Sequence, residues 1–425
     1  MELSSQQWED LSVISGRKVS ELCSLDGDDS SLLVFPDSLN YYDDDIGQSP
    51  IFTIRGDLIS TGNIMGFIGY RETSLKIFSR FDREEDDYLM HFLLERIFSI
   101  NIFDLPHTTD TEEVFEFLIF FFPHFLRQAM SQGLFRQYRT YKRNDANVHG
   151  VIDIPSHIRE NIPFLGKIAY RAREYSGDND LTELIRHTIE YIRTKPFGQS
   201  VLDHDEEIKG YVAEIREATL SYDPKERQRV IYKNQRPRIH PYFSEYEPLR
   251  RLCIQILREE EIKYGERDDK VYGVLFDGAW LWEEYLNTLL ETVGFKHPEN
   301  RKHDSKGFKT LFMSGKGRRY PDFFSDSMIL DAKYKKYNGK TLSSVAPEDI
   351  AQVVSYMHVK PVMTGGLLVP GEGDVYYEKE TLRGLGGDVF ILSLPIPRES
   401  ASYGEFCATM SENEMRFKEK IRYLS

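Results

Sequence analysis

Short apolar runs beside acidic turns characterise the N-terminal region of the chain. Residues 31–35 and 51–54 are apolar runs of strand length, and aspartate-rich segments at 26–29 and 43–45 lie next to them. Several short strands bounded by turn signals are typical of a small barrel or an open sheet. The pattern therefore predicts a β-rich domain over residues 1–105.

The middle of the chain carries its apolar residues at helical spacing instead. In residues 181–194, leucines and isoleucines recur every three or four positions until Pro196 ends the pattern. Residues 206–220 and 248–264 repeat this spacing, with charged residues on their outer faces. We expect a helical middle region over residues 106–265.

From residue 266 onward the pattern alternates between helix and strand. Residues 276–293 form an amphipathic helix, and apolar runs of strand length follow at 328–330 and 366–369. Pro347 begins a helix between these two runs, with acidic residues in its first turn, where they favour the helix dipole. The order helix, strand, strand, helix, strand predicts a C-terminal α/β domain over residues 266–425. The whole chain is thus predicted to be a multidomain α+β protein.

The stretch from Tyr320 to Tyr337 holds the strongest candidate chemistry. Side chains alternate between the two faces of a strand, so Ile329, Asp331 and Lys333 are expected to share one face. Asp322 ends the preceding strand of the same predicted hairpin. Two carboxylates and one ammonium group should therefore converge on one spot.

This grouping matches the PD-(D/E)xK pattern of metal-dependent nucleases. Paired carboxylates can hold Mg²⁺, which prefers oxygen ligands and keeps several waters, and the metal can activate a water and neutralise charge on a phosphate. A lysine beside them can orient that water or stabilise the developing charge. The short motif also occurs by chance, so an exposed hairpin with solvated charges stays open as the alternative.

Glu283 is a further candidate, on the predicted helix 276–293. Ala279 lies four residues before it, and Leu286 and Leu290 lie three and seven residues after it, so Glu283 falls on the apolar face. A carboxylate that faces a core needs a partner or a metal. The alternative is that Glu283 lies at the edge of the apolar stripe and reaches water.

The distribution of charge favours local binding of phosphate. The net charge of −15 argues against a general nucleic-acid coat. Residues 296–340, however, hold 12 Lys and Arg against 5 Asp and Glu, a balance of +7, which leaves −22 for the rest of the chain. A basic segment around the candidate metal site suits phosphate binding. A solvated basic loop is the alternative.

Cysteine usage and hydropathy indicate the setting of the protein. Cys23, Cys253 and Cys407 lie far apart and form no metal-ligand spacing, which is typical of the reducing cytosol. The first ten residues lack the basic and apolar regions of a signal peptide. The longest apolar stretch, residues 114–122, is too short to span a membrane. We therefore predict a cytoplasmic protein without membrane contact.

Motifs for binding nucleotides are absent from the sequence. Gly339-Lys340-Thr341 is similar to the end of a P-loop, but Tyr334 occupies the position of the required glycine. We expect this chain to bind no nucleotide, so any nucleotide-driven step should come from a partner.

The complete order of motifs resembles the McrC family, the nuclease subunits of McrBC-type, modification-dependent restriction systems. The resemblance covers most of the chain, and residues 1–105 resemble the family's N-terminal β domain. Residues 277–280 and the extra middle helices depart from the family pattern without touching the candidate metal ligands. The segments that carry the resemblance are Leu275-Phe276-Asp277, Leu281-Trp282-Glu283, Pro321-Asp322, residues 331–335, residues 348–352 with Tyr356, Gly133-Leu134 with Tyr138, residues 149–153 and residues 182–185.

The resemblance implies a Mg²⁺-dependent DNA endonuclease, with Mn²⁺ as a substitute metal. Lys333 would position and activate the water that attacks the phosphate. The metal ligands would be Asp322, Asp331 and the backbone carbonyl of Ala332, with Glu283 as a further ligand or a supporting contact.

The same resemblance assigns Gln352 to the site and implies two binding partners. One is double-stranded DNA, which is usually recognised in its methylated form by the other, an McrB-like AAA+ GTPase hexamer whose GTP hydrolysis would be stimulated through residues 1–105. The competing class is a non-catalytic regulatory subunit with a nuclease-like fold that activates an AAA+ NTPase. The set of Asp322, Asp331 and Lys333 favours the enzyme, because a scaffold has no need of buried charges.

Overall fold

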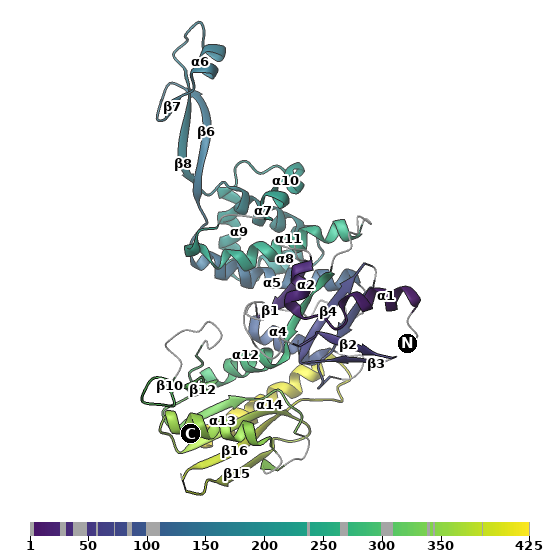
Figure 1. The fold of residues 1–425 in the computed structure, drawn as a ribbon. Coiled ribbons are helices and arrows are strands. Elements are labelled where there is room, and N and C mark those ends of the chain that lie inside the picture. The colour runs from purple at the N-terminus through teal and green to yellow at the C-terminus, as the bar shows by residue number, and fades with distance from the viewer. Residues whose placement is uncertain are drawn as a thin grey trace. The chain divides into compact units, whose positions relative to one another are not determined.

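The computed structural model describes residues 4–25, 31–36, 49–56, 58–71, 73–82, 87–98, 111–235, 239–263, 271–298, 309–337, 341–342, 345–384 and 386–424. The chain forms two compact units (Figure 1). Unit 1 comprises residues 1–102, 106–109 and 268–425, and unit 2 comprises residues 103–105 and 110–267. Both units contain helices and sheets, which confirms the predicted α+β class.

One sheet of unit 1 joins the N-terminal region to the start of the C-terminal region. Its strand order is β1-β9-β4-β5. β9 runs parallel to β1 and antiparallel to β4, so it lies between them. The regions predicted as the first and third domains therefore share a sheet, and the three-domain division stays a prediction. The strands are β1 (Ser31–Phe35), β4 (Ile64–Tyr70), β5 (Thr73–Ile77) and β9 (Val271–Asp277).

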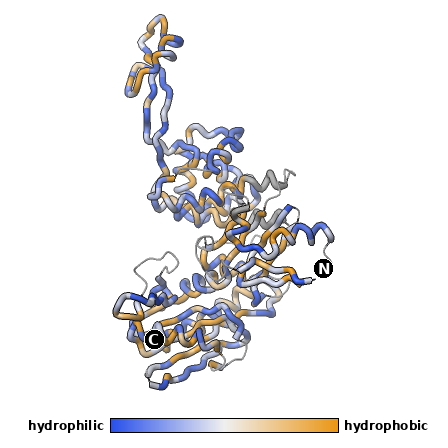
Figure 2. Tube along the Cα trace, in the orientation of Figure 1, coloured by the Kyte–Doolittle hydropathy of each residue, from blue (hydrophilic) through white to orange (hydrophobic). Residues whose placement is uncertain are grey.

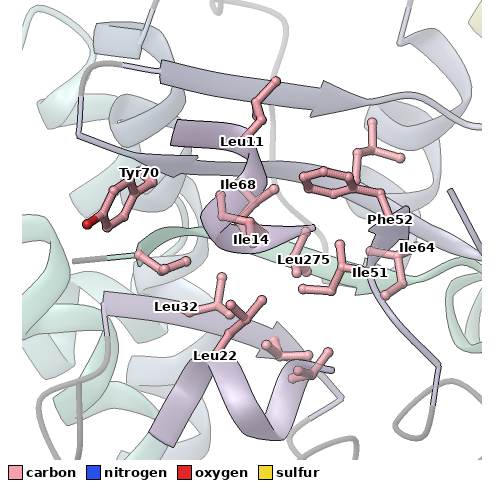
Figure 3. Packing of buried hydrophobic residues seen from close by; sticks show 14 residues of the cluster. Leu11, Ile14, Leu22, Leu32, Ile51, Phe52, Ile64, Ile68, Tyr70 and Leu275 are labelled. Carbon is pink, nitrogen blue, oxygen red and sulfur yellow. The ribbon is translucent and has the colours of Figure 1, made fainter. Parts of the chain in front are cut away.

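A buried apolar cluster ties β9 to the N-terminal elements. Figure 3 shows Leu11 and Ile14 from α1 (Ser5–Ile14) together with Ile68 and Leu275 from the sheet, all of them buried. Fully burying one such side chain contributes roughly 1.5–3 kcal/mol, so β9 is a structural part of the N-terminal core. Other elements of this part are α2 (Val19–Leu25), β2 (Phe52–Arg55), β3 (Leu58–Thr61) and α4 (Tyr88–Phe98).

The second large sheet of unit 1 has the order β12-β13-β14-β16-β15. β13, β14 and β16 are parallel, and the edge strands β12 and β15 are antiparallel to their neighbours. Parallel neighbours need a crossover connection, and α13 provides it between β13 and β14. α13 packs on both strands, while α12 contacts β13 and α14 contacts β16. The bounds are α12 (Gly278–Leu290), β12 (Phe323–Phe324), β13 (Met328–Ala332), α13 (Pro347–Val359), β14 (Thr364–Gly371), β15 (Tyr377–Thr381), β16 (Asp388–Pro395) and α14 (Tyr403–Leu424).

Unit 2 consists of packed helices and one projecting sheet (Figure 1). Its strands β6 (Gln137–Asp145) and β8 (Ile168–Ser176) pair along their whole length, and β7 (Val151–Ile152) and α6 (Ile154–Glu160) lie at the far end. The region predicted as helical therefore also contains a β-hairpin, whose far end is apolar in Figure 2. The helices are α5 (Thr111–Ser131), α7 (Asp180–Arg193), α8 (Gly198–Leu202), α9 (Glu206–Ala218), α10 (Arg227–Lys233) and α11 (Tyr246–Lys263).

Membrane-spanning length was also checked against the helices. Within the ranges that the structure describes, none is both long and apolar enough to cross a bilayer.

Candidate active site

Strand β13 presents Asp331 and Lys333 to helix α13. Ile329, two residues before Asp331, packs in a buried cluster with Val353 and Met357 of α13. Because alternate residues of a strand share a face, Asp331 and Lys333 point toward the same helix. The structure brings them together, with Lys333 Nζ 2.8 Å from Asp331 Oδ2.

Asp322 reaches the same place from the residue before β12. The pairing of Phe323 with Leu330 forms the predicted hairpin and puts Asp322 beside the end of β13. The backbone amide of Ala332 donates a hydrogen bond to Asp322 Oδ2 at 2.8 Å. Asp331 is 1% exposed, whereas Asp322 is only partly buried. Asp322 therefore lies on the solvent side of the pair.

Lys333 is held by polar groups of α13. Its Nζ donates to Gln352 Oε1 at 2.9 Å, and Gln352 Nε2 donates to the Tyr356 hydroxyl at 2.6 Å. Asp349 Oδ1 lies 3.9 Å from the same ammonium group. Gln352, which the sequence assigned only through the family, is thus in direct contact with Lys333, and Tyr356 fixes its orientation.

Close packing of α13 on β14 sets the position of Gln352. A Cβ atom at Gly365 of β14 would lie 2.5 Å from Val353 Cγ1 and 2.6 Å from Met357 Sδ, which is closer than carbon atoms pack. The missing side chain therefore lets the helix approach the sheet. The helix begins at Pro347, where the sequence placed its start.

Burial shapes the electrostatics of the two carboxyl groups. It raises the pKa of Asp331 to about 8, with the charge of Asp322 adding to the effect and Lys333 opposing it. It also raises the pKa of Asp322 to about 7, with a second contribution from the charge of Glu283. Burial lowers the pKa of Lys333, but Asp331 and Asp322 raise it by more, so the lysine stays charged. Two close carboxylates resist joint ionisation unless a cation neutralises them.

Helix α12 brings Glu283 to the edge of this site. Its carboxylate lies 3.8 Å from His297 Nε2, and His297 Nδ1 donates to the Asp322 carbonyl oxygen at 2.7 Å. Burial lowers the pKa of His297, but Glu284, Glu283 and the Asp322 carbonyl raise it by more, to about 9. A charged His297 therefore connects Glu283 to the backbone of Asp322.

The donor set suits a hard cation that keeps part of its water shell. Within the described ranges, no group of three or more His, Cys, Asp or Glu residues is arranged to hold a metal, so the site is not an all-protein cage. Mg²⁺ is usually held by one or two carboxylates together with waters and substrate phosphates. Apart from the ion pair with Lys333, the buried oxygens of Asp331 accept no hydrogen bond. Their lone pairs fit a metal, and Asp322 fits as the second carboxylate.

Asp349 and His297 belong to the site although the sequence did not single them out. Asp349 is buried and accepts hydrogen bonds from Lys335 Nζ at 2.6 Å and from the Tyr337 hydroxyl at 2.9 Å. Lys335 and Tyr337 follow Lys333 at intervals of two, a spacing that could have indicated a second acid near this edge. No spacing in the sequence indicates His297.

Tyr334 connects the candidate site to the N-terminal region of unit 1. Its hydroxyl lies 2.7 Å from Ser79 Oγ, and its ring packs edge-on against Phe81 at 5.0 Å. Trp282 of α12 donates from Nε1 to the Leu368 carbonyl oxygen at 3.3 Å. These buried contacts hold β13 and α12 in place around the carboxylates.

The predicted basic segment is described in part, because residues 299–308 and 338–340 lie outside the described residues. Its described part includes β10 (Lys309–Thr310) and β11 (Arg318–Arg319), which form a hairpin beside α13. Arg319 Nε donates to Ser355 Oγ of α13 at 2.8 Å. The basic groups of this hairpin therefore lie next to Gln352.

Comparison with known proteins identifies the family. Residues 59–370 match the family model described as "McrBC 5-methylcytosine restriction system component". No curated protein matches the chain. One similar solved structure is a half-complex from a tetradecameric assembly of Thermococcus gammatolerans McrB AAA+ hexamers with bound McrC, at 14% identity, 87% coverage of each chain and a TM-score of 0.43. Another is the Thermococcus gammatolerans McrBC complex, at 14% identity, 60% coverage of this chain, 74% of the other and a TM-score of 0.30.

The matched segment contains all five side chains proposed for the site. A component of a restriction system is therefore the class that the comparison defines. The chain belongs to the McrBC 5-methylcytosine restriction system component family, which confirms the resemblance found in the sequence.

Proposed function

We propose that this chain is the DNA endonuclease subunit of a two-component restriction system that acts in the cytoplasm. Residues 266–425 would be its PD-(D/E)xK nuclease domain. The observation that carries the proposal is the placement of Lys333, whose ammonium group lies 2.8 Å from Asp331 and 2.9 Å from Gln352. Family membership supports the restriction system, and this arrangement supports hydrolysis of phosphodiester bonds.

The residues present would divide the work of a Mg²⁺-dependent nuclease. Asp331 and Asp322 would hold the metal, with the Ala332 carbonyl and Glu283 as further contacts. When bound, Mg²⁺ would polarise the phosphate and lower the pKa of a coordinated water. Lys333 would keep its charge directed at the same place, where it can orient the water and stabilise the charge that develops on phosphate.

Hydrogen bonds from α13 would keep Lys333 ready for this role. Gln352 and Asp349 restrict the ammonium group, and Tyr356 restricts Gln352. A positioned donor costs less reorganisation in the transition state than a mobile one. Mn²⁺ should replace Mg²⁺, because the ligands would be oxygen atoms that both metals accept.

The proposed partner is an McrB-like AAA+ GTPase hexamer that binds DNA, usually in methylated form. The sequence of this chain has no P-loop, so GTP hydrolysis would belong to the partner. We assign its stimulation to residues 1–105. Strand β9 connects the sheet of that region directly to α12, which carries Glu283.

The test is cleavage of methylated and unmethylated plasmid by the full chain with the AAA+ protein encoded beside it, GTP and Mg²⁺. We expect linear product, and a loss of at least about a hundredfold in rate for Lys333→Met, because one stabilising donor is worth about that much. Lys336→Met is the matched control, since Lys336 is exposed three residues away. A wild-type chain that raises GTP hydrolysis but cuts nothing, with either metal, would be a regulatory subunit. Cleavage by Lys333→Met at the wild-type rate would remove the site.

A further inference from the structure

We propose that the hairpin β10–β11 is a DNA wedge. Phe312 and Met313 at its tip enter the minor groove beside the bond that is cut, and Arg318 and Arg319 at its base bind the phosphate backbone. The proposal rests on the proposed nuclease function for the position of the cleaved bond.

The hairpin has a defined conformation. Lys309 pairs with Arg319 and Thr310 pairs with Arg318. Beyond these pairs, the Leu311 amide donates to the Gly317 carbonyl at 2.8 Å. Gly315 and Gly317 adopt φ values of +78° and +68°, which suit glycine and close the turn tightly. The tip is therefore a built turn that holds its side chains outward.

The two residues at the tip are the most unusual feature of this hairpin. Phe312 is 57% exposed and Met313 is 107% exposed, although turn tips are normally polar. A Cβ atom at Gly317 would lie 3.1 Å from Phe312 Cδ2, so the ring rests against the glycine and stays directed away from the protein core. Two adjacent large apolar side chains at a projecting turn indicate a surface that is covered in use.

Basic groups flank this apolar tip. Lys316 lies within the turn, and Arg318 and Arg319 lie at the base. Both arginines line a pocket of about 340 Å³ together with Tyr320, Gln352 and Ser355, and Glu348 lines it as the acid among them. Arg319 is held by Ser355 Oγ at 2.8 Å. The size and the excess positive charge suit a backbone phosphate.

The pocket adjoins the candidate active site. Gln352, one of its walls, is the residue that binds Lys333. In the other direction, only Tyr320 and Pro321 separate β11 from Asp322. A strand bound in the pocket would therefore pass the metal ligands within about one nucleotide.

The reach of the tip sets where the duplex should be distorted. Three residues separate Thr310 from Met313, and an extended residue spans about 3.3 Å, which gives about 10 Å. Successive base pairs are about 3.4 Å apart along the duplex. The wedge should therefore act within about three base pairs of the cleaved bond.

The occupant is argued to be DNA because of the charge around the tip. Phe and Met are among the apolar side chains that proteins insert between base steps in the minor groove, usually with Arg or Lys on the adjacent backbone. A protein-binding tip would not require the paired arginines or the nearby active site. Binding to the AAA+ partner is the competing outcome, and the experiment below separates the two.

The test measures unwinding of DNA without cleavage. A relaxed plasmid is incubated at low salt with the full chain, a type IB topoisomerase and EDTA, then freed of protein, and its linking number is read on a gel. Base-step insertion should lower the linking number with increasing protein. Phe312→Ser with Met313→Ser should lose at least fivefold of this change at equal occupancy. Met363→Ser with Met415→Ser is the matched control, because both methionines are exposed elsewhere, and it should behave as wild type.

Binding is measured in parallel at several salt concentrations. Arg318→Ala with Arg319→Ala should weaken binding at least tenfold and reduce the salt dependence by about two phosphate contacts, while the double serine variant keeps its affinity within fivefold. Equal unwinding by wild type and the double serine variant would overturn the wedge. A double serine variant that unwinds DNA normally but fails to raise the partner's GTP hydrolysis would make the tip a protein contact.

These outcomes are independent of the nuclease function. Unwinding by a wild-type chain that never cuts DNA, even with its partner, GTP and Mg²⁺, would refute the nuclease and keep the wedge. Cleavage by wild type without any unwinding would do the reverse.

Discussion

Replacing Asp331 with asparagine should stabilise the metal-free protein while removing its proposed activity. Burial raises the pKa of Asp331 to about 8 in the folded protein, whereas in the unfolded chain an aspartate ionises near pH 4. Between these values the folded state holds a proton that the unfolded state has lost. The free energy of unfolding therefore falls as the pH rises through this window, and an amide escapes this fall because it does not ionise.

The size of the effect follows from the shift and from what Lys333 loses. One pKa unit corresponds to about 1.4 kcal/mol, so about four units give an upper bound of roughly 6 kcal/mol at pH 8. Asp331→Asn also removes the charge 2.8 Å from Lys333, and an unpaired buried charge is costly. Gln352 and Asp349 remain beside the ammonium group, which is 17% exposed. We expect a net gain of about 1–3 kcal/mol at pH 8 and none near pH 4.

Thermal unfolding in EDTA at pH 5 and pH 8 measures this difference. For a unit of this size, the gain corresponds to a rise in Tm of about 2–10 °C. Asp326→Asn, on the exposed turn of the same hairpin, makes the same chemical change and should leave Tm unchanged. Mg²⁺ should then raise the Tm of wild type but not that of Asp331→Asn, because only the folded wild type binds it. A variant that melts below wild type at pH 8, or that gains equally at both pH values, would refute the reasoning.

Three further predictions concern the fold and the division of labour. Gly273→Ala should destabilise unit 1 by roughly 3 kcal/mol or more, since φ is +150° and the new Cβ would lie 2.4 Å from the Phe67 carbonyl oxygen; urea unfolding tests this, with Gly210→Ala, which meets no atom within 4 Å, as the control. A fragment of residues 1–265 should fail to protect β1 and β4 from hydrogen exchange, because it lacks β9, and protection equal to the full chain would contradict this. The full chain alone should bind no GTP in calorimetry, and a micromolar dissociation constant would disprove the assignment of hydrolysis to the partner.

The sequence predicted what depends on local geometry. Strand alternation put Asp331 and Lys333 on one face, and Pro347 marked the start of α13, because both signals lie within a few residues of the feature they determine. Gln352 was different. It lies off the apolar stripe of α13, and its contact with Lys333 depends on how closely the helix packs on Gly365. Packing distance leaves no periodic trace in the sequence, so only the family resemblance found it.

Long-range pairing explains what the sequence did not indicate. The apolar run that becomes β9 predicts a strand, but nothing local in it identifies β1 and β4 as neighbours. The same holds for Tyr334, whose contacts with Ser79 and Phe81 join segments far apart in the chain. A sequence pattern reports the face that a residue presents, whereas the partner of that face follows from the whole topology.

The position of β9 has a consequence for the synthesis of this protein. Unit 2 lies between β5 and β9 in the chain, so the ribosome must add about two hundred residues after β4 before β9 emerges, which takes roughly 10–40 s at 5–20 residues per second. In the described sheet β1 pairs with β9 alone, and until then its edge is open to pairing with other chains. Unit 2, nearly continuous in sequence, can fold during that interval. The yield of soluble protein should therefore depend on protection of the nascent N-terminal region until residue 277 is made, more than on the stability of the finished fold.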